Sequence, residues 1–79
     1  MRVMVTGGAG FVGSHVCVAL AEAGHEPVIV DSFVNAKRDV PERIGRIVGG
    51  PPAVHEVDVG DMDGLDAVFS SGSFDAVIH

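Results

Sequence analysis

The 79-residue chain has no tryptophan, no tyrosine, one cysteine, and 5 basic residues against 11 acidic ones. A formal net charge of −6 leaves no basic patch for nucleic acid, and Trp and Tyr are not available to stack on bases. A lone cysteine excludes an internal disulfide and a multi-cysteine zinc site. We therefore expect no nucleic-acid partner, and a buried, reduced Cys17.

Long apolar runs are also missing, since no segment approaches the roughly 18 residues that a membrane-spanning helix needs. We expect no membrane partner and a cytoplasmic location. Hydrophobic residues nevertheless make up 47% of the chain and charged residues only 20%. This composition excludes a disordered chain and indicates apolar faces that further protein would cover.

Four short apolar runs predict β-strands, at residues 3–5, 28–30, 54–59 and 76–78. Most of these runs are continuous rather than alternating, which is typical of strands buried on both faces of a parallel sheet.

The segments between these strands carry helical spacing. In the first, residues 11–24, the spacing predicts one apolar face, and Gly24 is placed to end the helix. Pro41 opens a short second helix through Ile47, and Asp63 is the N-cap or a first-turn acid of a third. The predicted face of the first helix comprises Val12, Val16, Ala19, Leu20 and Ala23.

Strands and helices alternate as βαβαβαβ, which predicts the first part of a doubly wound α/β sheet with right-handed crossovers. The expected strand order is 3-2-1-4. We expect residues 1–79 to be a partial domain, cut at His79 after its fourth strand, with a substrate-binding domain lying outside it.

A glycine-rich turn follows the first strand, in the segment TGGAGFVG from Thr6 to Gly13. It matches GxGxxG and the wider TGxxGxxG. Glycines in such a turn permit a tight bend, a close approach of a pyrophosphate and close helix packing, and the helix N-terminus favours an anion. A P-loop needs Lys after its last glycine, whereas Gly13 is followed by Ser14, so that alternative fails.

An acid at the end of the second strand points to the identity of the bound group. Asp31 lies 18 residues after Gly13, close to the spacing expected of the acid that binds an adenosine ribose. A carboxylate there accepts hydrogen bonds from both ribose hydroxyls and repels a 2′-phosphate, so NAD is favoured over NADP. Lys37 or Arg38 folding over the adenosine would overturn that preference.

No metal site is predicted. The four histidines show no ligand spacing, and Asp58, Asp61 and Asp63 lack the glycine and terminal Glu of a calcium loop.

Four segments, TGGAGFVGSH, GHEPVIVDSFVNAKRDV, VDVGD and FDAVIH, resemble the N-terminal part of the extended short-chain dehydrogenases/reductases, which have a Rossmann NAD-binding domain. The likeness is strongest to members that epimerise a UDP-sugar at C4. It implies a pyrophosphate turn of Gly7, Gly10 and Gly13, with the N–H groups of Phe11 and Val12 on the phosphates.

The same resemblance implies an adenosine site. Asp31 would bind the ribose, Asn35 would lie against the same half of NAD, Asp58 would accept from the adenine amino group and the Val59 N–H would donate to the ring. Two residues depart from the family pattern: Ser32 stands where Asn is common and Ala36 where a hydroxyl residue is common.

Catalysis in this family implies a Tyr base with a Lys in a YxxxK motif, and the chain has no tyrosine. We therefore assign no catalytic residue here. The UDP-sugar would bind through a missing C-terminal part of a homodimeric enzyme. Another nucleotide-sugar dehydratase or decarboxylase, or a non-catalytic NAD-binding module, stays open as an alternative.

Replacing Asp31 by Ala tests the ribose assignment. We expect Asp31→Ala to weaken NAD binding about ten-fold or more and to reduce the discrimination against NADP, because both ribose hydroxyls lose a charged acceptor. Calorimetric titration of the two dinucleotides measures both effects. An unchanged preference for NAD would refute the role.

Overall fold

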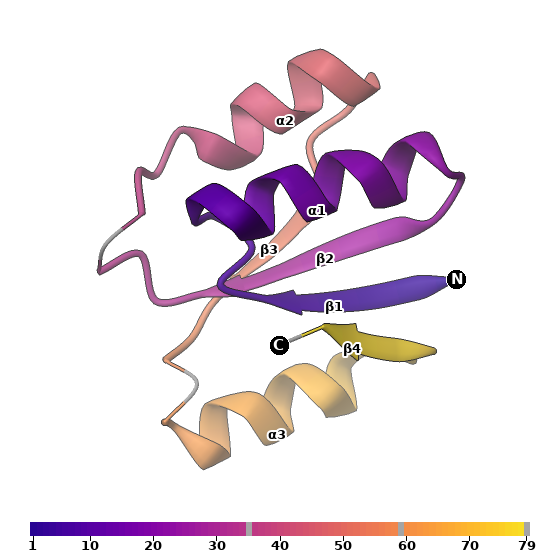
Figure 1. Cartoon of the computed structure of the whole chain (residues 1–79). Coiled ribbons are helices and arrows are strands. Elements are labelled where there is room, and N and C mark those ends of the chain that lie inside the picture. Colours follow the sequence, from indigo (N-terminus) through magenta and orange to yellow (C-terminus); the bar gives the residue numbers. More distant parts are fainter. Residues whose placement is uncertain (35, 59, 79) are drawn as a thin grey trace.

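The computed structural model describes residues 1–34, 36–58 and 60–78. Strands and helices alternate along the whole chain, as predicted (Figure 1). Their bounds are β1 (Arg2–Thr6), α1 (Phe11–Glu22), β2 (Glu26–Asp31), α2 (Val40–Val48), β3 (Ala53–Glu56), α3 (Met62–Ser71) and β4 (Ala76–Ile78).

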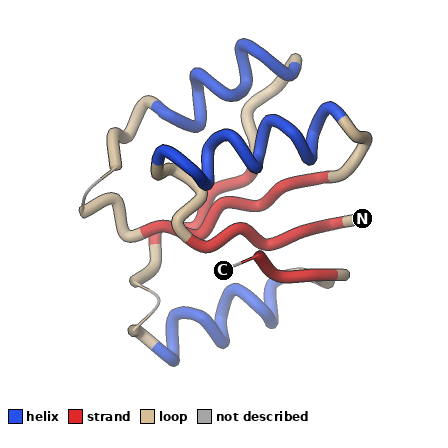
Figure 2. Tube along the Cα trace, in the orientation of Figure 1, coloured by secondary structure: helices blue, strands red, loops and turns tan. Residues whose placement is uncertain are grey.

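The strands form one four-stranded parallel sheet in the order β3-β2-β1-β4, which confirms the predicted doubly wound arrangement. In its register, Val5 of β1 lies between Ile29 of β2 and Ile78 of β4. The connections that follow the strands gather at the carboxyl ends of the strands (left in Figure 2), which we call the sheet edge below. In doubly wound sheets this edge carries the ligands.

Helices cover both faces of the sheet, with α1 and α2 on one face and α3 on the other (Figure 1). Val3 and Val5 pack with Cys17 and Ile44 under the first pair, while Met4 packs with Val68 on the opposite side. Adjacent residues of β1 are thus buried on opposite faces, which explains the continuous apolar run.

The third strand is shorter than the predicted 54–59, because β3 ends at Glu56. The Val57 N–H still donates to the Asp31 carbonyl at 3.0 Å. Beyond it, the Asp58 carboxylate accepts the Gly60 N–H at 2.8 Å and the Asp58 carbonyl accepts the Asp61 N–H at 2.8 Å. These two hydrogen bonds turn the chain out of the sheet and into α3.

The buried side of α1 also differs from the prediction. Val12, Ala19 and Ala23 are exposed, whereas Cys17 is fully buried. The prediction is confirmed for Val16 and Leu20, which pack against the core. It is wrong for the other three, because α1 is apolar on more than one side and its spacing did not select the side that faces the sheet.

Burial raises the pKa of the Cys17 thiol to about 11. The thiol therefore stays protonated at neutral pH. The protonated, buried thiol contributes fully to the free energy of unfolding below the ordinary thiol pKa of 9.0. This contribution is lost as the pH rises toward 11.

The helix ends follow local rules. Gly24 and Gly49 adopt left-handed conformations, with φ of +87° and +92°, after α1 and α2. Asp61 caps α3 by accepting the Gly64 N–H at 3.0 Å, and Asp63 is the acid of its first turn. None of the helices in the described part of the chain has the length and apolar character needed to cross a bilayer.

Removal of the α3 cap gives a measurable loss of stability. We expect Asp61→Ala to lower the free energy of unfolding by about 1 kcal/mol, because the Gly64 N–H loses its acceptor. The matched control is Asp66→Ala, which removes an exposed acid from the same helix. Urea unfolding followed by circular dichroism compares the two, and equal midpoints would contradict the capping role.

Candidate cofactor-binding site

The glycine-rich turn connects the end of β1 to the start of α1. Gly7 has a φ of +67°, which a glycine adopts without strain, and its N–H donates to the Val30 carbonyl at 2.8 Å. The Gly10 N–H then donates to the Gly7 carbonyl at 3.0 Å. These bonds fold the turn back onto β2 and start the helix directly above the sheet edge.

Gly13 has no room for a side chain. A Cβ at this position would lie 2.2 Å from the Gly7 carbonyl oxygen and 2.9 Å from the Gly8 Cα. The first turn of α1 therefore rests against the backbone of the glycine turn, as predicted for the last glycine of the motif.

The N-terminus of α1 presents backbone donors at this edge. Its N-cap is Gly10, which has no side chain to cap the helix, and the first turn contains no acidic residue. The N–H groups of Phe11, Val12 and Gly13 have no acceptor within the helix, because a helix leaves its first donors unpaired. Together with the helix dipole, these donors favour an anion.

A groove of about 340 Å³ lies beside these donors, where the strand order reverses between β1 and β4. The Thr6 hydroxyl donates to the Ile78 carbonyl at 3.2 Å and ties the two strand ends together. Ligands of doubly wound sheets bind at such a reversal. The groove is lined by Val5, Thr6, Gly7, Gly10, Val12, Gly13, Val16 and Ile78.

Asp31 links the glycine turn to the loop after β2. One carboxylate oxygen, Oδ2, accepts the Ala9 N–H at 3.0 Å, and the other, Oδ1, accepts the Phe33 N–H at 2.9 Å. A carboxylate has about four acceptor positions, so about two are left for a ligand. The predicted ribose acid therefore lies in contact with the predicted phosphate turn.

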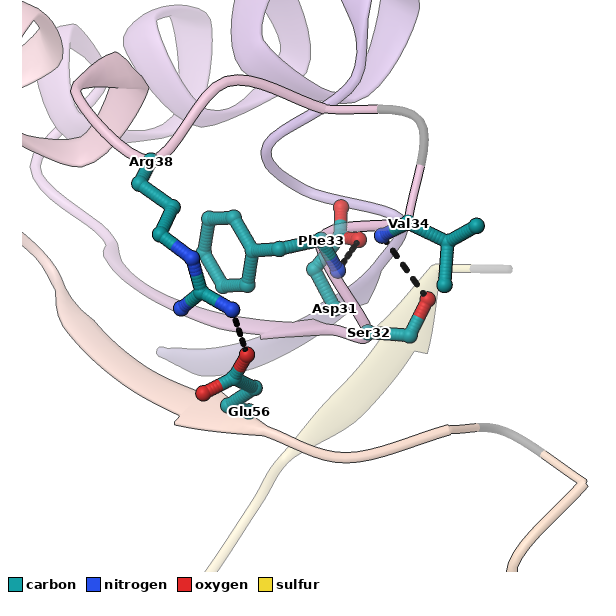
Figure 3. A network of polar contacts seen from close by, with 6 residues as sticks. All are labelled: Asp31, Ser32, Phe33, Val34, Arg38 and Glu56. Atoms are coloured by element: carbon teal, nitrogen blue, oxygen red, sulfur yellow. Dashed lines mark hydrogen bonds and ion pairs between the residues drawn. The ribbon is translucent and has the colours of Figure 1, made fainter.

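The loop after β2 holds a network that the sequence did not indicate (Figure 3). Phe33 has a φ of +58°, and the Arg38 guanidinium lies 5.3 Å from the centroid of its ring. Arg38 also forms a hydrogen-bonded ion pair with Glu56 of β3. That hydrogen bond raises the pKa of Arg38 and lowers the pKa of Glu56.

The remaining predicted positions are placed as follows. Asp58 is exposed in the turn between β3 and α3, with one oxygen holding Gly60. Asn35 and Val59 lie outside the described residues, so their predicted contacts stay predictions.

A second groove, of about 710 Å³, lies between α1 and α2 and is mostly apolar. Gly10 and Lys37 are part of its lining. His15 also lines it, with its Nδ1 donating to the Phe11 carbonyl at 2.7 Å. The described His, Cys, Asp and Glu side chains form no group of three that could hold a metal ion.

Adding one methyl group to Gly13 tests the close approach. We expect Gly13→Ala to cost about 1–3 kcal/mol of unfolding free energy, because the new Cβ would collide with backbone that cannot move freely. Gly50→Ala is the control, since a Cβ there meets nothing within 4 Å. Chemical denaturation measures both, and equal stability of the two variants would show that the turn has more room than described.

Comparison with known proteins places these features in one family. The model of the NAD dependent epimerase/dehydratase family matches residues 3–79. A UDP-glucose 4-epimerase of Yersinia pestis is 46% identical over 79 residues, which are 100% of this chain and 23% of that protein.

Two solved UDP-glucose 4-epimerases have the same fold over the whole chain. One, from Stenotrophomonas maltophila with bound NAD and formylated UDP-arabinopyranose, is 48% identical with a TM-score of 0.95. The other, from Bifidobacterium longum in complex with NAD+ and UDP, is 35% identical with a TM-score of 0.96. The chain spans 24% of each. It belongs to the NAD dependent epimerase/dehydratase family.

Proposed function

We propose that this chain is the NAD-binding N-terminal portion of a UDP-glucose 4-epimerase, which interconverts UDP-glucose and UDP-galactose. The observation that carries the proposal is the glycine turn at the β1–β4 reversal, joined by hydrogen bonds to Asp31. The relatives support the same assignment, since the Yersinia pestis and Stenotrophomonas maltophila proteins are UDP-glucose 4-epimerases.

The pyrophosphate of NAD fits the N-terminus of α1. Gly7 and Gly10 expose backbone rather than side chains, and the Phe11 and Val12 N–H groups would donate to phosphate oxygens. Gly13 keeps the helix close enough to the strand for those donors to reach the groove. This chain therefore binds the phosphates through geometry and backbone dipoles, without a lysine in the turn.

The adenosine half fits the ends of β2 and β3. Asp31 would accept the ribose hydroxyls with the acceptor positions that Ala9 and Phe33 leave free. Asp58 would accept from the adenine amino group. Asn35 and the Val59 N–H complete the site in our proposal.

The chain's own part in the reaction is to bind and orient. When bound, NAD supplies the group that takes a hydride from the sugar and returns it. Since the 79 residues include no tyrosine, the proton transfer would fall to residues outside them. Residues 1–79 are accordingly, in this proposal, part of a larger NAD-binding domain, with a separate substrate domain for the UDP-sugar.

A homodimeric assembly and a cytoplasmic location belong to the same proposal. They rest on the family resemblance. Sedimentation of the full-length protein tests the assembly, and a monomer at micromolar concentration would contradict it.

A nucleotide-sugar dehydratase or decarboxylase is the second candidate, because the matching family includes dehydratases. Two features at the adenosine loop also favour it. Ser32 stands where Asn is common in the family pattern, and its hydroxyl accepts the Val34 N–H in a long contact of 3.5 Å. Ala36, where a hydroxyl residue is common, packs against the core under α1.

The reaction itself separates the candidates. We expect the full-length protein carrying this chain to convert UDP-glucose to UDP-galactose with no change in mass, since epimerisation only inverts C4. Mass spectrometry and proton NMR of the product test this. Loss of water from UDP-glucose, or of carbon dioxide from a UDP-uronic acid offered in its place, would identify the second candidate. NAD binding with no turnover of any UDP-sugar would identify a non-catalytic module.

A further inference from the structure

The ion pair between Arg38 and Glu56 joins two segments at the cofactor edge of the sheet. Glu56 is the last residue of β3, and its Cα is paired in register with that of Asp31 on β2. Arg38 lies in the loop that follows β2. The loop arginine is therefore anchored to the strand next to the one that carries the proposed ribose acid (Figure 3).

The ring of Phe33 restrains the same guanidinium. The Asp31 carboxylate accepts the Phe33 N–H at 2.9 Å, which holds Phe33 in its left-handed conformation. The ring then lies 5.3 Å from the Arg38 guanidinium, within the range of a cation–π interaction. One connected series of contacts thus runs from Asp31 through Phe33 to Arg38 and Glu56.

The position of Arg38 bears on which dinucleotide can bind. An arginine near the ribose acid is what accommodates a 2′-phosphate in NADP sites. Here such an arginine is present two contacts away from Asp31, but its charge is neutralised by Glu56.

We propose that Glu56 is a positioning residue for cofactor choice, which holds Arg38 against Phe33 and so prevents it from receiving the 2′-phosphate of NADP. This inference rests on the proposed function, since it assumes that the Asp31 edge binds the adenosine ribose. Selectivity for NAD then has two sources, which are the carboxylate of Asp31 and the restraint of Arg38.

The other charges near Arg38 leave Glu56 as its partner. A shallow pocket surrounds Arg38, and its described lining contains two carboxylates, Glu56 and Glu42. Glu42 pairs instead with Arg46 at 3.1 Å. Lys37 lines the separate groove between α1 and α2. Loss of the Glu56 charge is therefore the change that favours release of Arg38.

The expected effect is moderate, because both partners are exposed to solvent, with 70% and 49% of their side chains accessible. Exposed ion pairs change equilibria by up to about five-fold. We expect Glu56→Gln, which preserves the shape of the side chain, to raise the affinity for NADP relative to NAD by about three- to five-fold.

The experiment is a double-mutant cycle on the full-length protein, with calorimetric titration of NAD and NADP against wild type, Glu56→Gln, Arg38→Ala and the double variant. We expect Arg38→Ala to leave the NADP-to-NAD ratio within about two-fold of wild type. The double variant should match Arg38→Ala, because Glu56 acts through the arginine. Glu26→Gln is the control, since it breaks a partly exposed ion pair with Arg2 at the opposite end of the strands.

Each outcome decides a different point. If Glu56→Gln raises the affinity for NADP relative to NAD equally with and without Arg38, removal of negative charge alone explains the rise and the positioning role is wrong. No rise in the ratio would overturn it too. If wild type binds neither dinucleotide, the proposed function itself fails. The Arg38 Nε–H resonance of the free protein supplies an independent readout, because Glu56→Gln should shift it whether or not a dinucleotide binds.

Discussion

The contact on which the rest of this structure depends is the approach of Gly13 to the backbone of Gly7. With 2.2 Å between a notional Cβ and the Gly7 oxygen, only glycine lets α1 lie this close to the end of β1. That approach turns Cys17, one helical turn later, into the core, where its thiol lies 3.9 Å from the Gly8 carbonyl. It also brings the unpaired donors of the helix to the groove where the strand order reverses.

Asp31 has a second role beside the one that its position suggests. Its two oxygens hold the glycine turn at Ala9 and the following loop at Phe33, so the same carboxylate organises both halves of the proposed NAD site. Substitution of Asp31 would therefore disturb the loop as well as the proposed ribose contact. In our proposal, substitution of Glu56 changes the preference between NAD and NADP without removing that central acid.

The sheet supplies a rigid base for these contacts. The central strands β1 and β2 bury Val3, Val5, Val28 and Ile29 almost completely, so the strand ends that carry Thr6 and Asp31 are held in place by packing on both faces. The helices are less covered. Phe11 and Val12, for example, are 82% and 72% exposed.

The sequence by itself determined the alternation of strands and helices, the strand order, the glycine turn and the acid that follows it. Most of these features depend on short-range signals: continuous apolar runs, glycines at fixed spacing, and a residue at a strand end. The strand order follows from the alternation through the topology rules of doubly wound sheets. Only the tertiary structure decided which side of α1 is buried, where β3 ends, and that Arg38 pairs with Glu56. The first depends on how closely Gly13 lets the helix lie. The last depends on the register of β2 with β3, which brings together residues 18 positions apart that share no local pattern.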